Sequence, residues 1–155
     1  MGEFTVRGPQ AVDFVSYVTT NDVAALKPGQ AQYSTILRED GTIVDDCLVY
    51  RSEDSVLMVV NGSNIDKDFA HISRSLKKFP DAKLENLSDQ IALLALQGPE
   101  SARILRQQTD VDLSKIKYYE FVRGKIAGVD GVYISRTGYT GEDGFELYFP
   151  PEQAK

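Results

Sequence analysis

The chain has 155 residues, of which 42% are hydrophobic and 26% charged, as in an ordinary globular protein of one domain or two small ones. Its formal net charge of −6 argues against nucleic acid or an anionic membrane surface as the main partner, and residues 91–96, the longest apolar run, are too short to span a bilayer. One cysteine, Cys47, excludes an internal disulfide and fits a reducing compartment, and one histidine, His71, leaves no His/Cys cluster for a zinc site.

The first part of the chain predicts a strand-rich α+β unit with one antiparallel sheet. The Asp40-Gly41 pair is a hairpin signal, because both residues readily adopt positive φ. Apolar residues recur at helical spacing from Ile65 to Leu76, which predicts an amphipathic helix. The expected order is βαβββαβ, a ferredoxin-like unit, with strands at 3–7, 30–38, 42–51, 55–61 and 83–87, and helices at 10–18 and 64–78.

The remaining residues predict part of a second, related α+β domain, so we expect domains at 1–87 and 88–155. The Gly98-Pro99 helix start echoes Gly8-Pro9, residues 109–111 resemble residues 20–23, and each half later reaches a tyrosine, although chance similarity explains so weak a likeness equally well. Helix-start residues at 150–155 with no helix body after them suggest a fragment. The expected elements are strands at 91–97, 116–123, 131–135 and 145–149, and a helix at 100–108.

Adjacent acids, Asp45 and Asp46, interrupt an apolar strand. Neighbouring strand residues point to opposite faces, so one of the two carboxylates faces the apolar side unless an edge exposes it. A carboxylate held against apolar surroundings is paired or functional. The alternative is a strand-end aspartate that accepts hydrogen bonds from nearby backbone. Glu146, between Phe145 and Leu147, poses the same question.

Residues 135–147 read SRTGYTGEDGFEL, a glycine-rich loop between two short strands. This loop lacks the lysine and the helix that a phosphate-binding P-loop requires. Tyr33, Tyr119 and Tyr139 offer flat faces and hydroxyls for an aromatic ligand, although strand tyrosines are commonly packing residues. From the residues alone, the prediction stops at an α+β protein with an acid-lined pocket for an aromatic ligand.

The loop sequence resembles a hallmark of the glycine cleavage system T-protein (aminomethyltransferase) family. The resemblance extends over essentially the whole chain, and the loop is its most specific part. The other matching segments are Met1-Gly2-Glu3, Thr20-Asn21-Asp22, Ala31-Gln32-Tyr33-Ser34, Ile43-Val44-Asp45-Asp46, Asn64-Ile65-Asp66-Lys67-Asp68 and Leu96-Gln97-Gly98-Pro99. Where the family often has Gly-Gly before the acidic strand, this chain has Gly41-Thr42, and Cys47 replaces an aliphatic residue.

The resemblance implies tetrahydrofolate as cofactor and a lipoylated H protein as partner, which delivers an aminomethyl group from which ammonia is released. The family's catalytic aspartate matches Asp46, and its pterin-binding glutamate matches Glu146. A carboxylate beside the reacting nitrogen would orient the pterin and accept or stabilise a proton. Further folate contacts match Tyr33, Tyr119, Tyr139, Val59 and Asn61. No metal ligand set is implied.

Family members are much longer than 155 residues, so we expect this chain alone to be less than fully active. One alternative is a non-catalytic folate-binding module, related to iron–sulfur maintenance proteins or to the folate domain of dimethylglycine and sarcosine dehydrogenases. Another is a structural unit that binds nothing. The resemblance implies a cytoplasmic protein if the source is bacterial and a mitochondrial matrix protein if it is eukaryotic.

Overall fold

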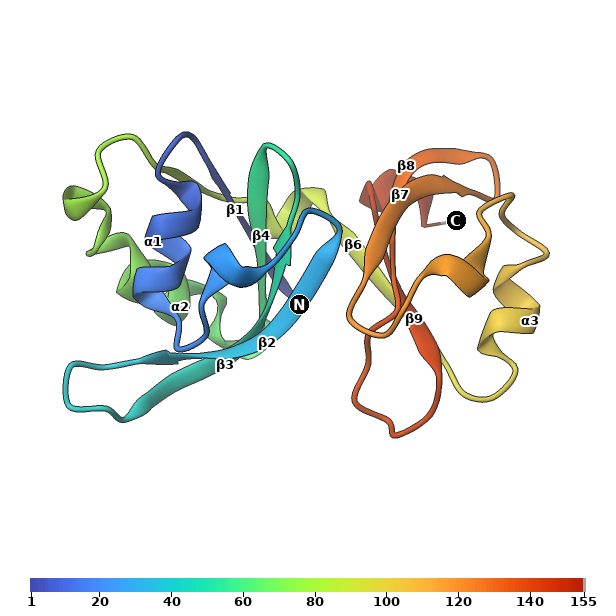
Figure 1. The fold of residues 1–155 in the computed structure, drawn as a ribbon, viewed down its shortest axis with the longest axis horizontal. Helices are drawn as coiled ribbons and strands as arrows, with labels where there is room; N and C mark the ends of the chain where they lie inside the picture. Colours follow the sequence, from blue (N-terminus) through green and yellow to red (C-terminus); the bar gives the residue numbers. More distant parts are fainter. Residues whose placement is uncertain (155) are drawn as a thin grey trace. The chain divides into compact units, whose positions relative to one another are not determined.

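The computed structural model describes residues 1–154 and contains two compact units, an N-terminal unit, Met1–Ser88, and a C-terminal unit, Asp89–Lys155 (Figure 1). Each is an α+β structure with one antiparallel sheet, which confirms the predicted fold class. The N-terminal unit contains β1 (Gly2–Arg7), α1 (Ala11–Val18), η1 (Val23–Ala25), β2 (Gln30–Leu37), β3 (Ile43–Arg51), β4 (Ser55–Val60), η2 (Gly62–Asn64), α2 (Ile65–Ser73), η3 (Leu76–Lys78) and β5 (Lys83–Asn86).

The sheet of the N-terminal unit has the strand order β2-β3-β4-β1-β5, and every neighbouring pair is antiparallel. Without β2, this is the ferredoxin-like order of two βαβ crossovers, and β2 extends the sheet at one edge. The β2–β3 hairpin turns at Asp40-Gly41, where Gly41 has a φ of 83°. The predicted order βαβββαβ is therefore confirmed.

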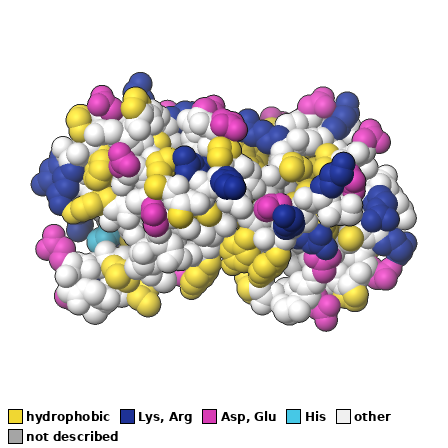
Figure 2. All heavy atoms as spheres, viewed as in Figure 1, with side chains coloured by type: hydrophobic (Ala, Val, Ile, Leu, Met, Phe, Trp, Pro, Cys, Tyr) yellow, Lys and Arg dark blue, Asp and Glu magenta, His cyan; other side chains and the backbone are white. Residues whose placement is uncertain are grey.

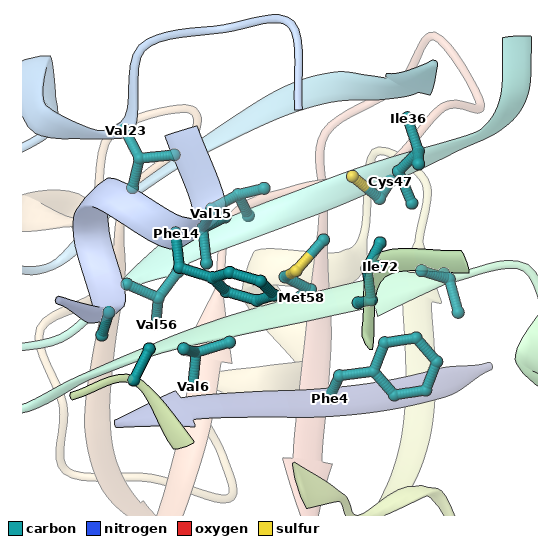
Figure 3. Packing of buried hydrophobic residues seen from close by; sticks show 14 of the residues in the cluster. Phe4, Val6, Phe14, Val15, Val23, Ile36, Cys47, Val56, Met58 and Ile72 are labelled. Carbon is teal, nitrogen blue, oxygen red and sulfur yellow. The ribbon is translucent and has the colours of Figure 1, made fainter. Parts of the chain in front are cut away.

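Both helices of the N-terminal unit cover the same face of its sheet (Figures 1 and 3). Phe14 and Val15 of α1 and Ile72 of α2 belong to one buried cluster with alternate residues of the strands, among them Val6 and Met58. Phe4 of β1 meets Phe69 of α2 edge to face, with ring centroids 5.2 Å apart. The residues between these in each strand point to the opposite face, and that second face carries the candidate site described below.

The C-terminal unit has the strand order β6-β9-β8-β7, again fully antiparallel. Its core is smaller and is built around Leu105, Leu113, Ile134 and Phe145. The elements are η4 (Ser88–Gln90), which begins at the last residue of the N-terminal unit, then β6 (Ala92–Gln97), α3 (Ser101–Leu105), η5 (Leu113–Lys115), β7 (Phe121–Ile126), β8 (Val129–Ser135), β9 (Gly144–Phe149) and η6 (Pro151–Gln153).

The two units repeat one topology, because β6-β9-β8-β7 matches β1-β4-β3-β2 strand for strand. The turns before α1 and α3 match as well, since Gly8 and Gly98 both have positive φ and each accepts a hydrogen bond from the residue three positions later. Asp22 and Asp112 cap η1 and η5 in the same way. The weak internal likeness in the sequence therefore reflects a structural repeat.

The structure corrects the expected register of this repeat. Tyr119 corresponds to Gly29 and not to Tyr33, because the backbone N–H groups of Gly29 and Tyr119 donate to the matching carbonyls of Arg51 and Arg136. Tyr33 lies within β2, whereas Tyr119 lies in the turn before β7. The predicted match between residues 20–23 and 109–111 is also displaced, since the capping aspartates are Asp22 and Asp112.

Three expected elements have clearly different bounds. The helix predicted at 100–108 is α3 only from Ser101 to Leu105. The strand predicted at 116–123 begins only at Phe121, because the turn at 117–120 precedes it, and the Lys117 N–H donates to Glu120. The helix predicted at 64–78 is α2 only as far as Ser73, followed by the short η3. The Ser73 hydroxyl donates to the Phe69 carbonyl, a back-bond that competes with helix continuation.

Candidate functional site

The acidic pair on β3 lies on both faces of the N-terminal sheet, as the strand period requires. Asp46 is paired with Thr35 of β2 and points to the face away from the helices, as Tyr33 and Leu48 do. Asp45 points to the helix-covered face and is only 8% exposed, whereas Asp46 is half-buried. The two neighbouring carboxylates therefore lie in different environments.

Two donors hold the Asp46 carboxylate, one on each oxygen. The Tyr33 hydroxyl donates to Asp46 Oδ2 at 2.9 Å, and the Asn61 amide Nδ2 donates to Asp46 Oδ1 at 2.6 Å. The same Asn61 nitrogen donates to Asp45 Oδ1 at 2.9 Å, so one amide links both acids. Asn61 reaches this position from the end of β4, and buried Val59 precedes it on the same face. Tyr33, Asp46, Val59 and Asn61 therefore form one group on one face of one sheet.

In the C-terminal unit, Glu146 is a buried carboxylate among hydroxyl groups. It lies on β9 opposite Ser135 of β8 and is 8% exposed. The buried Thr137 hydroxyl donates to Glu146 Oε2, and Ser135 Oγ lies 3.0 Å from Thr137 Oγ1. A carboxyl group so placed can accept further hydrogen bonds from a ligand.

The glycine-rich loop between β8 and β9 closes around a side chain from another strand, Gln97 of β6. Gln97 Nε2 donates to the carbonyls of Thr137 and Phe145, at 3.1 and 3.4 Å. A Cβ at Gly138 or at Gly144 would lie only 2.3 or 2.1 Å from Gln97 Oε1, so both positions must be glycine while Gln97 keeps this place. Two of the three regularly spaced glycines thus admit a side chain to the base of the loop.

An ion pair fixes the two ends of this loop. Arg136 Nε and Nη2 donate to the two oxygens of Asp143, at 2.8 and 2.7 Å, and hydrogen bonding from Arg136 lowers the pKa of Asp143 despite some burial. Tyr139 extends from the loop between them and is 95% exposed. The loop therefore has a rigid base and presents an aromatic ring to solvent.

Tyr119 has a φ of 64°, in the left-handed region that L-residues seldom adopt. Its ring meets that of Tyr118 edge to face, with centroids 4.7 Å apart. Burial, and then Tyr118 and Glu146, raise the pKa of the Tyr119 hydroxyl. Strain of this kind at a bulky residue persists where the surrounding structure or a function requires it.

The chain belongs to the GCVT N-terminal domain family. A model of this family matches residues 1–155. The aminomethyltransferase of Bacteroides fragilis is 53% identical over 99% of this chain, and that of Thermotoga maritima is 47% identical over 99%. The chain spans 42% of the length of each of these relatives.

A solved structure agrees with this family assignment, and a second one shares the fold. The chain matches the glycine cleavage system aminomethyltransferase T of Bartonella henselae with a TM-score of 0.85 and 35% identity, over 96% of this chain and 39% of that one. A heterotetrameric sarcosine oxidase from Corynebacterium sp. U-96 matches with a TM-score of 0.61 at 16% identity, over 99% of this chain and 73% of that one, which shows a shared fold.

The predicted site residues of this family member fall into two sets. In the N-terminal unit, Tyr33 and Asn61 donate to Asp46, and Val59 lies on the same face, paired with Leu48. The other set, in the C-terminal unit, consists of Tyr119, Tyr139 and Glu146, of which Tyr119 lies close enough to Glu146 for the carboxylate to affect its pKa. Their roles as ligand contacts remain predictions.

Three polar residues that support these sets were missed in the sequence. Thr137 and Gln97 hold Glu146 and the glycine-rich loop, and buried Asp68 of α2 lies on the helix-covered face beside Asp45. For Asp68 a signal was present: it falls three residues after Ile65 and four before Ile72, on the apolar stripe of the predicted helix. An acid on that stripe indicates a buried partner.

A hollow of about 890 Å³ in the N-terminal unit contains none of the predicted site residues. Its lining includes Tyr17 of α1, Arg38 just after β2, His71 of α2, Arg74 just after α2, and Lys78 of η3. Charged side chains of both signs are interspersed over the face in Figure 2.

Within residues 1–154, no group of three or more His, Cys, Asp or Glu side chains is arranged to hold a metal ion. None of the helices in this range is both long and apolar enough to cross a membrane.

Proposed function

We propose that this chain is the folate-binding part of an aminomethyltransferase of the glycine cleavage system. The proposed reactants are tetrahydrofolate and the aminomethyl group on the lipoyl arm of the H protein, and the products are methylenetetrahydrofolate, ammonia and the dihydrolipoyl H protein. The family match over residues 1–155 and the aminomethyltransferase relatives support this proposal. Because the chain spans about two fifths of those relatives, we propose folate binding for this chain and turnover for chains of the relatives' length.

The observation that carries the proposal is the doubly held carboxylate of Asp46. Tyr33 and Asn61 each donate to one oxygen, which fixes the carboxylate plane and leaves acceptor capacity on both oxygens. Tetrahydrofolate, when bound, supplies the nitrogen that takes up the methylene unit. We assign Asp46 the role of holding that nitrogen in place and of accepting or stabilising the proton it loses.

Two further features of the candidate site fit a pterin. Glu146 presents a buried carboxylate to ring N–H and amino donors, which is a charge-assisted and directional contact. Tyr119 and Tyr139 present aromatic faces.

We propose residues 1–87 as a ferredoxin-like domain and 88–155 as part of a second folate-binding domain. Since the similar relatives are bacterial, the proposed location is the cytoplasm.

Calorimetric titration of this chain with tetrahydrofolate under anaerobic conditions tests the proposal. We expect saturable binding, weakened about 10- to 100-fold in Glu146→Gln, because a hydrogen bond to a charged group contributes about 1.5–3 kcal/mol. Glu142→Gln, on the exposed part of the same loop, is the matched control and should bind as the wild type does. Unchanged affinity in Glu146→Gln would remove this residue from the pterin site. No binding by the folded wild-type chain would refute folate binding here.

A further inference from the structure

Asp68 is a fully buried carboxyl on the face of α2 that packs against the sheet. Its side chain is 0% exposed, and neither of its oxygens has a hydrogen-bond donor within reach. Lys67 Nζ is 3.6 Å from Asp68 Oδ1, beyond hydrogen-bond distance, and donates instead to the Val44 carbonyl at 2.7 Å. Lys67 therefore pairs with Asp68 by charge but gives it no hydrogen bond at this distance. A buried carboxylate without hydrogen bonds is costly, so the state of this carboxyl also depends on a second neighbour.

That neighbour is Asp45 of β3. Lys67, which is 3.6 Å from Asp68, donates to the carbonyl of Val44, the residue before Asp45, and the Asp45 and Asp68 side chains are within hydrogen-bonding reach of each other. Asp45 Oδ2 is also buried and makes no hydrogen bond of normal geometry, although the Asn64 side chain is near enough to help lower the Asp45 pKa. Two carboxyl groups in contact satisfy each other only when one of them carries a proton and donates it to the other. Burial, followed by the contact with Asp45, raises the pKa of Asp68 to about 7. Burial opposes ionisation of Asp45 as well, but hydrogen bonds from Asp68 and Asn61 bring its pKa below the usual value.

The other oxygen of Asp45 connects this pair to the candidate site. Asp45 Oδ1 accepts from Asn61 Nδ2 at 2.9 Å, and that nitrogen also donates to Asp46 Oδ1 at 2.6 Å. Tyr33 completes the chain of contacts on Asp46 Oδ2 at 2.9 Å. The contacts run from the helix-covered face of the sheet to the opposite face through one amide, whose two hydrogens serve two carboxylates.

We propose that Asp68 and Asp45 are positioning residues that share one proton and thereby hold the Asn61 amide across Asp46. With the proton present, Asp45 is fixed between Asp68 and Asn61. When the proton is lost, two carboxylates repel each other in a buried space, Asp45 moves, and Asn61 loses one of its two acceptors. The effect on ligand binding rests on the proposed function, whereas the proton-dependent position of Asn61 does not.

The other titratable groups around the pair do not supply this proton. On β3, burial and the three aspartates raise the pKa of the Cys47 thiol to about 12, so it is neutral at ordinary pH. On α2, Lys67 is engaged with the Val44 carbonyl, and the His71 ring is within hydrogen-bond distance of the Leu37 carbonyl, at 3.0 Å. Ile36, which pairs with Asp45 from β2, carries no charge.

The test follows the Asn61 side-chain amide by nuclear magnetic resonance in the free chain, between about pH 5 and pH 9. Its signals are identified by their absence in Asn61→Asp. In the wild type we expect them to shift with a midpoint near the pKa of Asp68, about 7. The comparison is made in a Glu3→Gln background, because Glu3 of β1 pairs with Val59, two residues before Asn61, and burial raises its pKa to about 7 as well. In Asp68→Asn, which donates to Asp45 at every pH, the shift should then vanish. Asp66→Asn, an exposed acid on the same helix, should titrate as the wild type does. The proposal would be overturned if the Asn61 signals did not shift with pH in the wild type, or if they shifted in Asp68→Asn with the same midpoint and size as in the wild type.

Asp68→Leu and tetrahydrofolate binding complete the design. Asp68→Leu removes the donor, so the Asn61 signals should resemble those of the high-pH wild type throughout; should this variant not fold, Asp68→Asn still decides. The wild-type dissociation constant should rise several-fold between about pH 6 and pH 8.5, and that of Asp68→Asn much less. If no tetrahydrofolate binds but Asn61 titrates as expected, the proposed function fails and the positioning pair stands. If tetrahydrofolate binds but the Asn61 signals do not change with pH, the positioning pair fails and the proposed function stands.

Discussion

Single residues in this chain carry local costs that their structural counterparts avoid. Tyr119 has a φ of 64° where the matching turn of the N-terminal unit has Gly29 at 86°. A left-handed conformation costs an L-residue about 1–2 kcal/mol and costs glycine almost nothing. A tyrosine at this position therefore makes the fold less stable than a glycine would. Such a cost is expected where the side chain has a function.

Glu3 carries a second such cost, and it makes stability depend on pH. It is 1% exposed, both carboxyl oxygens lack partners, and burial raises its pKa to about 7 although the nearby amino terminus opposes this. The folded state then binds more protons than the unfolded state between the ordinary value of 4.5 and about 7. The stability that Glu3 contributes is therefore fully present below pH 4.5 and is lost as the pH rises through about 7.

Glu3→Gln should remove this loss. We expect the variant to be more stable than the wild type by roughly 1–3 kcal/mol near pH 8, and nearly equal to it near pH 4. Urea unfolding at both pH values measures the difference. Asp68 contributes to the wild-type slope in the same direction, so only the gap between the two proteins is diagnostic. A gap independent of pH would show that Glu3 is ionised normally in the folded chain.

At the scale of elements, the glycine-rich loop is held by a contact that local sequence does not reveal. Gln97 lies 40 residues before Thr137, to whose carbonyl it donates. The sequence pattern predicted the loop and its two strands, and the resemblance singled out Tyr139 and Glu146. Neither the pattern nor the resemblance predicted that two glycines make room for Gln97. The periodicity of a strand shows which face of the sheet a side chain is on, but not which distant residue it contacts.

Gly144→Ala tests this packing. The new methyl group would lie 2.1 Å from Gln97 Oε1, so Gln97 must move and give up its bonds to Thr137 and Phe145. We expect a loss of about 1–3 kcal/mol in the free energy of unfolding, measured by urea denaturation. Combined with Gln97→Ala, the loss should be clearly less than additive. Additive losses would mean that Gly144 serves a purpose unconnected with Gln97.

Other elements show where sequence patterns succeed and fail. The Asp40-Gly41 hairpin was predictable because its turn chemistry is local. The start of β7 was not, since Tyr118 and Tyr119 favour strands by propensity but lie in a turn secured by hydrogen bonds from Lys117 to Glu120 and from Tyr119 to Arg136. The opposite faces of Asp45 and Asp46 followed from the strand period, whereas the link through Asn61 required the fold.

At the scale of the whole molecule, the two units are unequally equipped to fold. The N-terminal unit buries 15 residues in its core and covers Phe4 of β1 with α2. The C-terminal core has 7 buried residues, and within residues 89–154 no strand pairs with the outer edge of β6. Leu94, which corresponds to Phe4, is 55% exposed, whereas Phe4 is 0% exposed. An open edge and an exposed leucine mark the weaker unit.

We therefore expect residues 1–88 expressed alone to unfold cooperatively in urea, with strand and helix signals in circular dichroism that coincide. Residues 89–155 expressed alone should show a shallow transition or associate, because a core of that size contributes at most about 3–5 kcal/mol. Size-exclusion chromatography of both pieces distinguishes folding from association. A sharp monomeric transition for residues 89–155 would contradict this ranking.

The repeated topology also places each residue beside an internal relative. Thr5 pairs with Leu57 in the first half, and Ala95 pairs with Glu146 in the second, so the acid stands where its counterpart is a leucine. If both halves descend from one duplicated ancestor, that difference arose after the copies separated. The two halves of one chain then record a single divergence at this position, and Leu57→Glu would make the two halves alike there.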